Sequence, residues 1–258
     1  MTDHWDESMR RRYTCRRLAA PLDLFADEED AGWQALPWSE PFADITGLDE
    51  LEPVFRTRMR MGWDDRYLYV NAEMEEPHVW GTISERNAVM FEDNDFEIFI
   101  DPDCDGLNYY EFEINALGSI WELSLPKPYG EGGEPLLGCN IDGLVSRVRI
   151  DGTLNDPTDI DRGWKVEVAI PWSGLREYHA SGACPPRPGD RWRINFSRVQ
   201  WRHEVIDGRY VRIPPHGTPL AESLNPEEQE HPEDNWVWSP QGAVNMHLPK
   251  RWGDLLFE

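Results

Sequence analysis

Apolar and polar residues alternate with a period of two through most of this chain. In RYLYVNAEM (66–74), Leu68, Val70, Ala72 and Met74 lie on one face of an extended backbone. Successive side chains of a β-strand point to opposite sides of its sheet, so this pattern predicts strands with one buried face. The same alternation, bounded by Gly, Pro, Asn or Asp, recurs in VFRTRMRM (54–61), DFEIFID (95–101), YYEFEIN (109–115), SIWELSL (119–125), LVSRVRI (144–150), GWKVEVAI (163–170), DRWRINFSRV (190–199) and GDLLFE (253–258).

Many strands separated by turns, without a strand–helix–strand rhythm, predict an all-β fold. The sequence favours a two-sheet antiparallel β-sandwich, jelly-roll-like, with only short helical turns such as WSGLREY (172–178). We expect residues 1–258 to form a single domain, with residues 1–20 as an N-terminal arm that carries a cluster of arginines. The Pro-rich, polar stretch near residues 203–235 is long for a loop and predicts either a functional lid or a disordered excursion.

The predicted hairpin DNDFEIFIDPDCDGLNYYEFEIN (93–115) carries an unusual charge pattern. Alternation places Asp95, Glu97, Glu111 and Glu113 on one face of the strand pair. Like charges that face each other across a β-ladder are destabilising. We therefore expect a metal ion, an arginine, ligand hydroxyls or protonation to offset the repulsion.

The overall charge restricts the class of partner. The formal net charge is −24, whereas nucleic acids and anionic membranes are bound chiefly through Lys and Arg, so neither partner is expected. No apolar run is long enough to span a bilayer, and the first residues lack the apolar region of a signal peptide. The chain as written is expected in the cytoplasm, or outside the cell if a leader was removed. The oligomeric state is not predicted.

The turn DPDCDG (101–106) has oxygen ligands at alternate positions followed by a glycine. This resembles the beginning of an EF-hand loop, but the twelfth position is Phe112 rather than a bidentate glutamate. Two interpretations stay open: a looser calcium site that uses Asp101, Asp103 and Asp105, or a plain acidic turn.

Three functional interpretations fit the residues. Carboxylates combined with flat aromatic rings suit sugar recognition, and the chain contains 13 Trp. Paired carboxylates also suit glycoside hydrolysis, although the chain contains no catalytic motif of the hydrolase, zinc-protease or phosphate-loop kind. The third interpretation is an interaction protein whose sugar site has decayed.

The order and spacing of several segments resemble the carbohydrate-binding module family 9-like group. The segments are WDDRYLYV (63–70), FEDNDFEIFID (91–101), YYEFEIN (109–115), GWKVEVAIPW (163–172), GDRWRINFSRVQW (189–201), NWVWSPQG (235–242) and KRWGDLLF (250–257). The resemblance implies a β-sandwich that binds a neutral sugar or glycan end without catalysis, with calcium supporting the fold.

The resemblance also implies a set of site residues. Two aromatic residues that clamp a sugar fall on Phe91 and Trp238, with Trp236 nearby, and the acidic and amide contacts fall on Glu97 and Asn195. An arginine of the family falls on Glu113, which removes a cation from the site. Arg193 or Arg198 is then expected to supply the missing positive charge, and Arg193 is the better placed because alternation puts it on the same face as Asn195.

Overall fold

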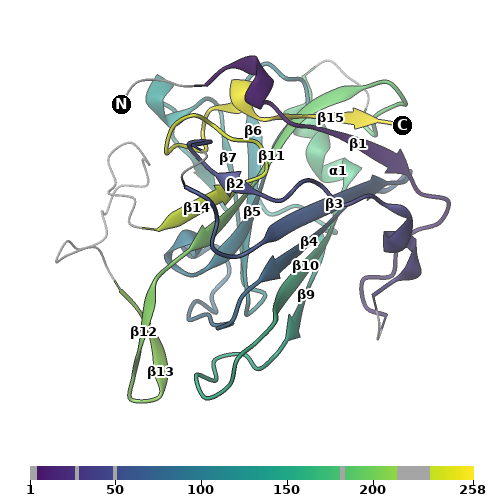
Figure 1. Ribbon diagram of the computed structural model, residues 1–258. Helices are drawn as coiled ribbons and strands as arrows, with labels where there is room; N and C mark the ends of the chain where they lie inside the picture. The colour runs from purple at the N-terminus through teal and green to yellow at the C-terminus, as the bar shows by residue number, and fades with distance from the viewer. Residues whose placement is uncertain (1–4, 27–28, 49–50, 181–183, 214–232) are drawn as a thin grey trace.

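The computed structural model describes residues 5–26, 29–48, 51–180, 184–213 and 233–258 (Figure 1). It confirms the all-β prediction. The strands are β1 (Arg12–Arg17), β2 (Ala43–Asp44), β3 (Thr57–Trp63), β4 (Tyr67–Glu75), β5 (Asp95–Asp101), β6 (Tyr109–Asn115), β7 (Ile120–Leu125), β8 (Leu136–Leu137), β9 (Val145–Asp151), β10 (Gly163–Pro171), β11 (Arg191–Gln200), β12 (His203–Ile206), β13 (Arg209–Arg212), β14 (Asp234–Val237) and β15 (Gly253–Phe257).

Thirteen of the fifteen described strands form one curled, mixed sheet rather than two separate antiparallel sheets. The hydrogen-bonded order is β8-β7-β6-β5-β11-β15-β1-β3-β4-β10-β9, with β14 added beside β11 and β2 beside β14. Strand β1 joins the two halves because it pairs in parallel with β15 at Arg12–Cys15 and with β3 at Arg16–Arg17. The expected sandwich is therefore present as two packed halves of a continuous ladder (Figure 1).

Part of the predicted N-terminal arm is this joining strand. Tyr13 and Cys15 are buried on its core side, and the Tyr13 hydroxyl donates to the Pro37 carbonyl at 2.7 Å and accepts from the Met61 amide at 2.9 Å. Arginines at 12, 16 and 17 obscure the alternation in the sequence. This segment is held in place by its two buried side chains and by backbone pairing with β15 and β3.

The main core lies between the two halves of the sheet. One half contributes Phe96, Ile98 and Ile100 from β5, and the other contributes Val166 and Val168 from β10, all of them fully buried. A second apolar cluster, which includes Phe99, Trp121 and Leu123, lies on the opposite face of the β5-β6-β7 half. This half of the sheet is consequently buried on both faces, and its second face carries the site described below.

The segment near 203–235 divides into three parts. Strands β12 and β13 form a separate two-stranded hairpin, and β14 returns to the main sheet beside β11. Residues 214–232, which contain all five prolines of the predicted excursion, lie outside the described residues.

The remaining features are minor. The expected helical turn is present as α1 (Trp172–Leu175) followed by a 3-10 turn at Arg176–Tyr178. Cys15, Cys104, Cys139 and Cys184 are all free thiols. Among the described residues, no helix has the length and apolar character needed to cross a membrane.

A buried ion pair links the core to the loop that follows β4. Arg198 Nη2 donates to Glu76 Oε2 at 3.0 Å, and the guanidinium also contacts Thr57 and Gln200 and stacks on the Trp236 ring at 5.1 Å. Both members of the pair are nearly inaccessible to solvent, at 1% and 2% side-chain exposure.

We predict that Glu76→Gln lowers the free energy of unfolding by about 3 to 5 kcal/mol, because it leaves the Arg198 charge buried without its counter-ion. Urea unfolding followed by tryptophan fluorescence measures the effect. The control is Glu75→Gln, which removes the half-exposed pair with Arg56 and should cost less than about 1 kcal/mol. Equal losses in the two variants would contradict the prediction.

Candidate functional site

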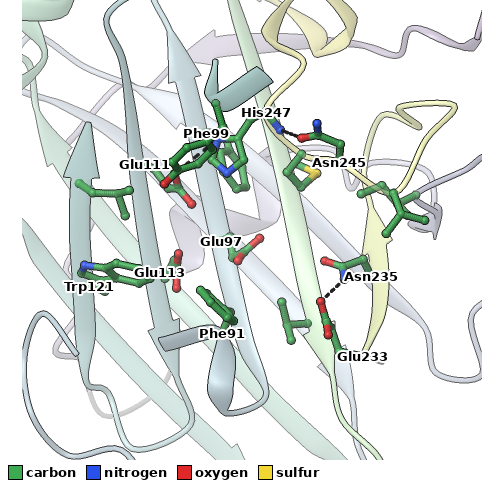
Figure 2. Close-up of a pocket in the computed structure, with 16 residues that line it drawn as sticks. Phe91, Glu97, Phe99, Glu111, Glu113, Trp121, Glu233, Asn235, Asn245 and His247 are labelled. Atoms are coloured by element: carbon green, nitrogen blue, oxygen red, sulfur yellow. Dashed lines mark hydrogen bonds and ion pairs between the residues drawn. The ribbon is translucent and has the colours of Figure 1, made fainter. Parts of the chain in front are cut away.

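The acids of the β5-β6 hairpin lie on one face of the sheet, as the alternation predicts. Glu97 is directly opposite Glu113, Asp95 is opposite Asn115, and Phe99 is opposite Glu111. The intervening residues Phe96, Ile98 and Ile100 fill the main core. Glu97, Glu111 and Glu113 project from the opposite face of the sheet (Figure 2).

These three glutamates line a pocket over the second face of the sheet. The space between the lining side chains amounts to about 620 Å³ when the open solvent at its mouth is included. Figure 2 shows Trp121 and Phe91 on the side nearer Glu113, and Asn235 and Glu233 across the pocket from them. The full lining is Ile45, Phe91, Glu97, Phe99, Glu111, Glu113, Trp121, Leu123, Tyr129, Val199, Glu233, Asn235, Val244, Asn245, Met246 and His247.

Aromatic rings form two parts of the pocket wall. Phe91 and Trp121 are 6.1 Å apart with their planes inclined at 38°, and Phe91 remains half-buried. Tyr129 packs edge-on against His247 at 4.5 Å, and His247 also bonds to the Tyr109 hydroxyl at 2.9 Å. The indole Nε1 of Trp121 is buried and has no hydrogen-bond partner among the described residues. The wall therefore offers aromatic ring surface to a ligand.

The four carboxyls of this face are removed from solvent. Asp95 and Glu113 are 0% and 1% exposed, and Glu97 and Glu111 are 5% and 4% exposed. Burial, the largest cause, raises the pKa of Glu97 to about 8, opposed by a hydrogen bond from Ser197. Burial and then the neighbouring carboxylates raise the pKa values of Asp95, Glu111 and Glu113 well above the ordinary range.

No arginine or lysine among the described residues forms an ion pair with these four carboxyls. The nearest basic group is His247, whose Nδ1 is 4.0 Å from Glu111 Oε2. Arg193, the cation expected from the sequence, is engaged by Asp254 at 2.5 Å and does not line the pocket. The expectation that Arg193 neutralises Glu97 is therefore wrong, because the nearer Asp254 holds its guanidinium.

Asn195 is placed on the expected face but is occupied by the backbone. Its Nδ2 donates to the Ser239 carbonyl at 2.9 Å, and its Oδ1 accepts from the amides of Phe196 and Ser239. The side chain is fully buried and anchors the chain after β14 to β11. It does not line the pocket.

Trp236 and Trp238 lie on the core side of the sheet. Trp238 is 0% exposed and packs against Phe196 at 6.0 Å, and a Cβ atom at Gly253 would be only 2.2 Å from its ring. Trp236 is 3% exposed and stacks on Arg198. The expected sugar clamp on Trp238, with Trp236 beside it, is therefore corrected, because both indoles pack in the main core. Val237, which lies between them in the chain, belongs instead to the apolar cluster on the pocket side.

Of the predicted contacts, the structure brings together Phe91, Glu97 and Glu113. It adds residues that the sequence did not single out as ligand contacts: Trp121, Tyr129, Asn235, Asn245 and His247. The β6-β7 register places Trp121 opposite Glu113, on the pocket side of the sheet. Tyr129 and Asn245 lie outside the strands and could not be placed by alternation.

The loop after β5 contains the second group of acids. One carboxylate oxygen from each of Asp101, Asp103 and Asp105 lies within 4.8 Å of the others. Asp101 accepts from the amides of Cys104 and Gly106 at 3.1 and 2.9 Å, so it also builds the turn, and burial raises its pKa to about 7. Asp103 Oδ1 is buried and has no hydrogen-bond partner in the part of the chain that the structure describes. This all-oxygen donor set fits calcium.

Three comparisons bear on these features. Residues 27–184 match the carbohydrate family 9 binding domain-like family. The endo-1,4-beta-xylanase A of Thermotoga maritima is 25% identical over 134 residues, which are 50% of this chain. The chain spans about a tenth of that xylanase, since the match covers 10% of its length.

Solved structures share the fold at low sequence identity. A candidate carbohydrate-binding protein from Bacteroides uniformis has a TM-score of 0.62 and 17% identity, over 96% of this chain and 100% of that one. A family 9 carbohydrate-binding module from Caldicellulosiruptor kristjanssonii in complex with cellotriose has a TM-score of 0.55 and 15% identity, over 96% and 94% of the two chains.

The family match extends over more than half of the chain and includes the β5-β6 hairpin that supports the pocket. This chain belongs to the carbohydrate family 9 binding domain-like family.

Proposed function

We propose that this protein binds carbohydrate without catalysis, with the end of a neutral glycan seated in the pocket over β5, β6 and β7. The observation that carries the proposal is the combination of aromatic rings and buried carboxylates in one open pocket (Figure 2). The solved structures of the C. kristjanssonii module with glucose and with cellotriose support this ligand class.

Each part of the pocket has a chemical role in this proposal. The Phe91 and Trp121 rings provide an apolar surface for the C–H face of a sugar. Glu97 and Glu113 accept from sugar hydroxyls, and the Asn235 amide can both donate and accept. A neutral sugar also avoids adding a further negative charge to this acidic site.

We predict that Phe91→Ala weakens sugar binding at least tenfold, because it removes a half-buried ring from the pocket wall. Isothermal titration with glucose, cellotriose and xylotriose measures the change. The matched control is Trp38→Ala, since Trp38 is also half-buried but stacks on Arg58 and Arg60 outside the pocket. A loss in the control equal to that in Phe91→Ala would refute the placement of the ligand.

We further infer that the Asp101, Asp103 and Asp105 loop holds a calcium ion that supports the fold. A chelator should then lower the melting temperature of the wild-type protein, because a ligand at about 100 times its Kd stabilises the folded state by about 2.7 kcal/mol. Asp103→Asn should reduce this response to calcium in a thermal-shift measurement. An unchanged calcium response in Asp103→Asn would assign the loop to a plain acidic turn.

A glycoside hydrolase is the second candidate, favoured by the cross-strand pair Glu97 and Glu113. The raised pKa of Glu97 is what a general acid requires, and opposed carboxyls on neighbouring strands are close enough for a retaining mechanism. Under the binding proposal, incubation with xylan or cello-oligosaccharides yields no new reducing ends. Release of reducing ends by wild type but not by Glu113→Gln would instead establish the hydrolase.

A further inference from the structure

Asp95 occupies an unusual position beneath the pocket. Its side chain is 0% exposed, and neither carboxylate oxygen accepts a hydrogen bond from any N–H or hydroxyl donor in the described part of the chain. Glu113 Oε2, close to it on β6, is also buried and without a partner. A buried carboxylate without a donor or a cation costs several kcal/mol, so Asp95 needs either a proton shared with the neighbouring Glu113 carboxyl or a bound cation.

Other buried acids nearby are fully supplied with partners. Asp93, two residues earlier, accepts from the amides of Thr82 and Ile83, from the Thr82 hydroxyl and from Asn115 Nδ2. Glu122 on β7 accepts from Arg86, the Tyr110 hydroxyl and the Ile141 amide. The fold therefore satisfies buried carboxylates elsewhere with its own donors, and Asp95 differs from them.

The three carboxylates around this point have the geometry of a metal site. One oxygen each from Asp95, Glu97 and Glu113 lies within 4.8 Å of the other two. A calcium ion bound at 2.3 to 2.6 Å from each ligand can contact oxygens with this separation. All three ligands are hard oxygen donors, which favours calcium over zinc or copper.

We propose that Asp95, Glu97 and Glu113 bind one calcium ion in the floor of the pocket. Three carboxylates supply three to six oxygens, whereas calcium takes six to eight, so positions remain for other ligands. Glu97 and Glu113 line the pocket, whereas Asp95 does not. The remaining coordination positions of the calcium ion therefore face the pocket. In a step that rests on the proposed function, two neighbouring hydroxyls of the bound sugar fill them.

The first experiment counts calcium ions without sugar. Chelator-treated full-length protein is titrated with calcium at pH 7.5 by isothermal titration calorimetry, as wild type, Asp95→Asn and Asp103→Asn. Asp95→Asn should bind one calcium fewer per chain than wild type, while Asp103→Asn retains the calcium of the pocket floor. Circular dichroism confirms that both variants, which are nearly isosteric, are folded.

Equal calcium stoichiometry in wild type and Asp95→Asn overturns the proposal, and shared protons then account for the buried carboxyls. A thermal-shift titration with calcium provides the second readout. Under the proposal, the Asp103→Asn protein is still stabilised by calcium, and the double variant with Asp95→Asn is not. Stabilisation of the double variant equal to that of Asp103→Asn overturns it as well.

The second experiment titrates glucose and cellotriose with calcium and again with chelator. Affinity at least tenfold lower in chelator, and equally low in Asp95→Asn with calcium, supports coordination of the sugar, since Asp95 itself does not line the pocket. Affinity unchanged by chelator overturns that step. If calcium binds through Asp95 but no sugar binds in any condition, the proposed function fails and the cation site stands.

Discussion

The burial of four carboxyls on one face of β5 and β6 is the constraint around which this half of the molecule is organised. Strand β5 pairs with both β6 and β11, and its other face is committed to the main core. The sheet cannot turn its acids toward the apolar core, because the register is fixed on that side by Phe96, Ile98 and Ile100. The acids therefore face a second, covered surface, where their charge has to be offset by a ligand, a cation or a proton.

The arginines of the sheet show why the protein itself does not provide that offset. Arg198 projects into the core and pairs with Glu76, while Arg193 pairs with Asp254 near β15. Both pairs connect segments far apart in the chain, so both guanidinium groups serve the fold. Among the described residues, neither guanidinium reaches the carboxylates on the face of Glu97. Their charge is therefore left to be offset by a ligand, a cation or a proton.

The long strands were predictable from the sequence, whereas the short ones were not. The expected strand segments located β3 through β7 and β9 through β11, each of six residues or more, and the five-residue β15. It missed β1, because arginines flank its two buried side chains, and it could not assign the two-residue strands. The continuous ladder through β1 depends on parallel pairing between the two ends of the chain, which no local pattern reveals.

The candidate site was predictable where alternation applied and not elsewhere. Glu97 and Glu113 follow directly from the period of β5 and β6. The prediction that Trp238 clamps the sugar was wrong because β14 is short. Four residues show too little alternation to tell which of Trp236, Val237 or Trp238 faces the pocket. Trp121 lies in a strand whose two faces are both largely buried, and an apolar face predicts burial without distinguishing core from pocket.

The two interpretations of the glutamate pair exclude each other on protonation grounds. A general acid in glycoside hydrolysis has to hold a proton when the glycosidic bond breaks, which the raised pKa of Glu97 would allow. A metal ligand has to be deprotonated, and binding of a cation releases the proton. Calcium held by Asp95, Glu97 and Glu113 would thus remove the acid that a hydrolase needs, while it improves the contacts available to sugar hydroxyls. A cation held by these three carboxylates would therefore favour recognition over catalysis.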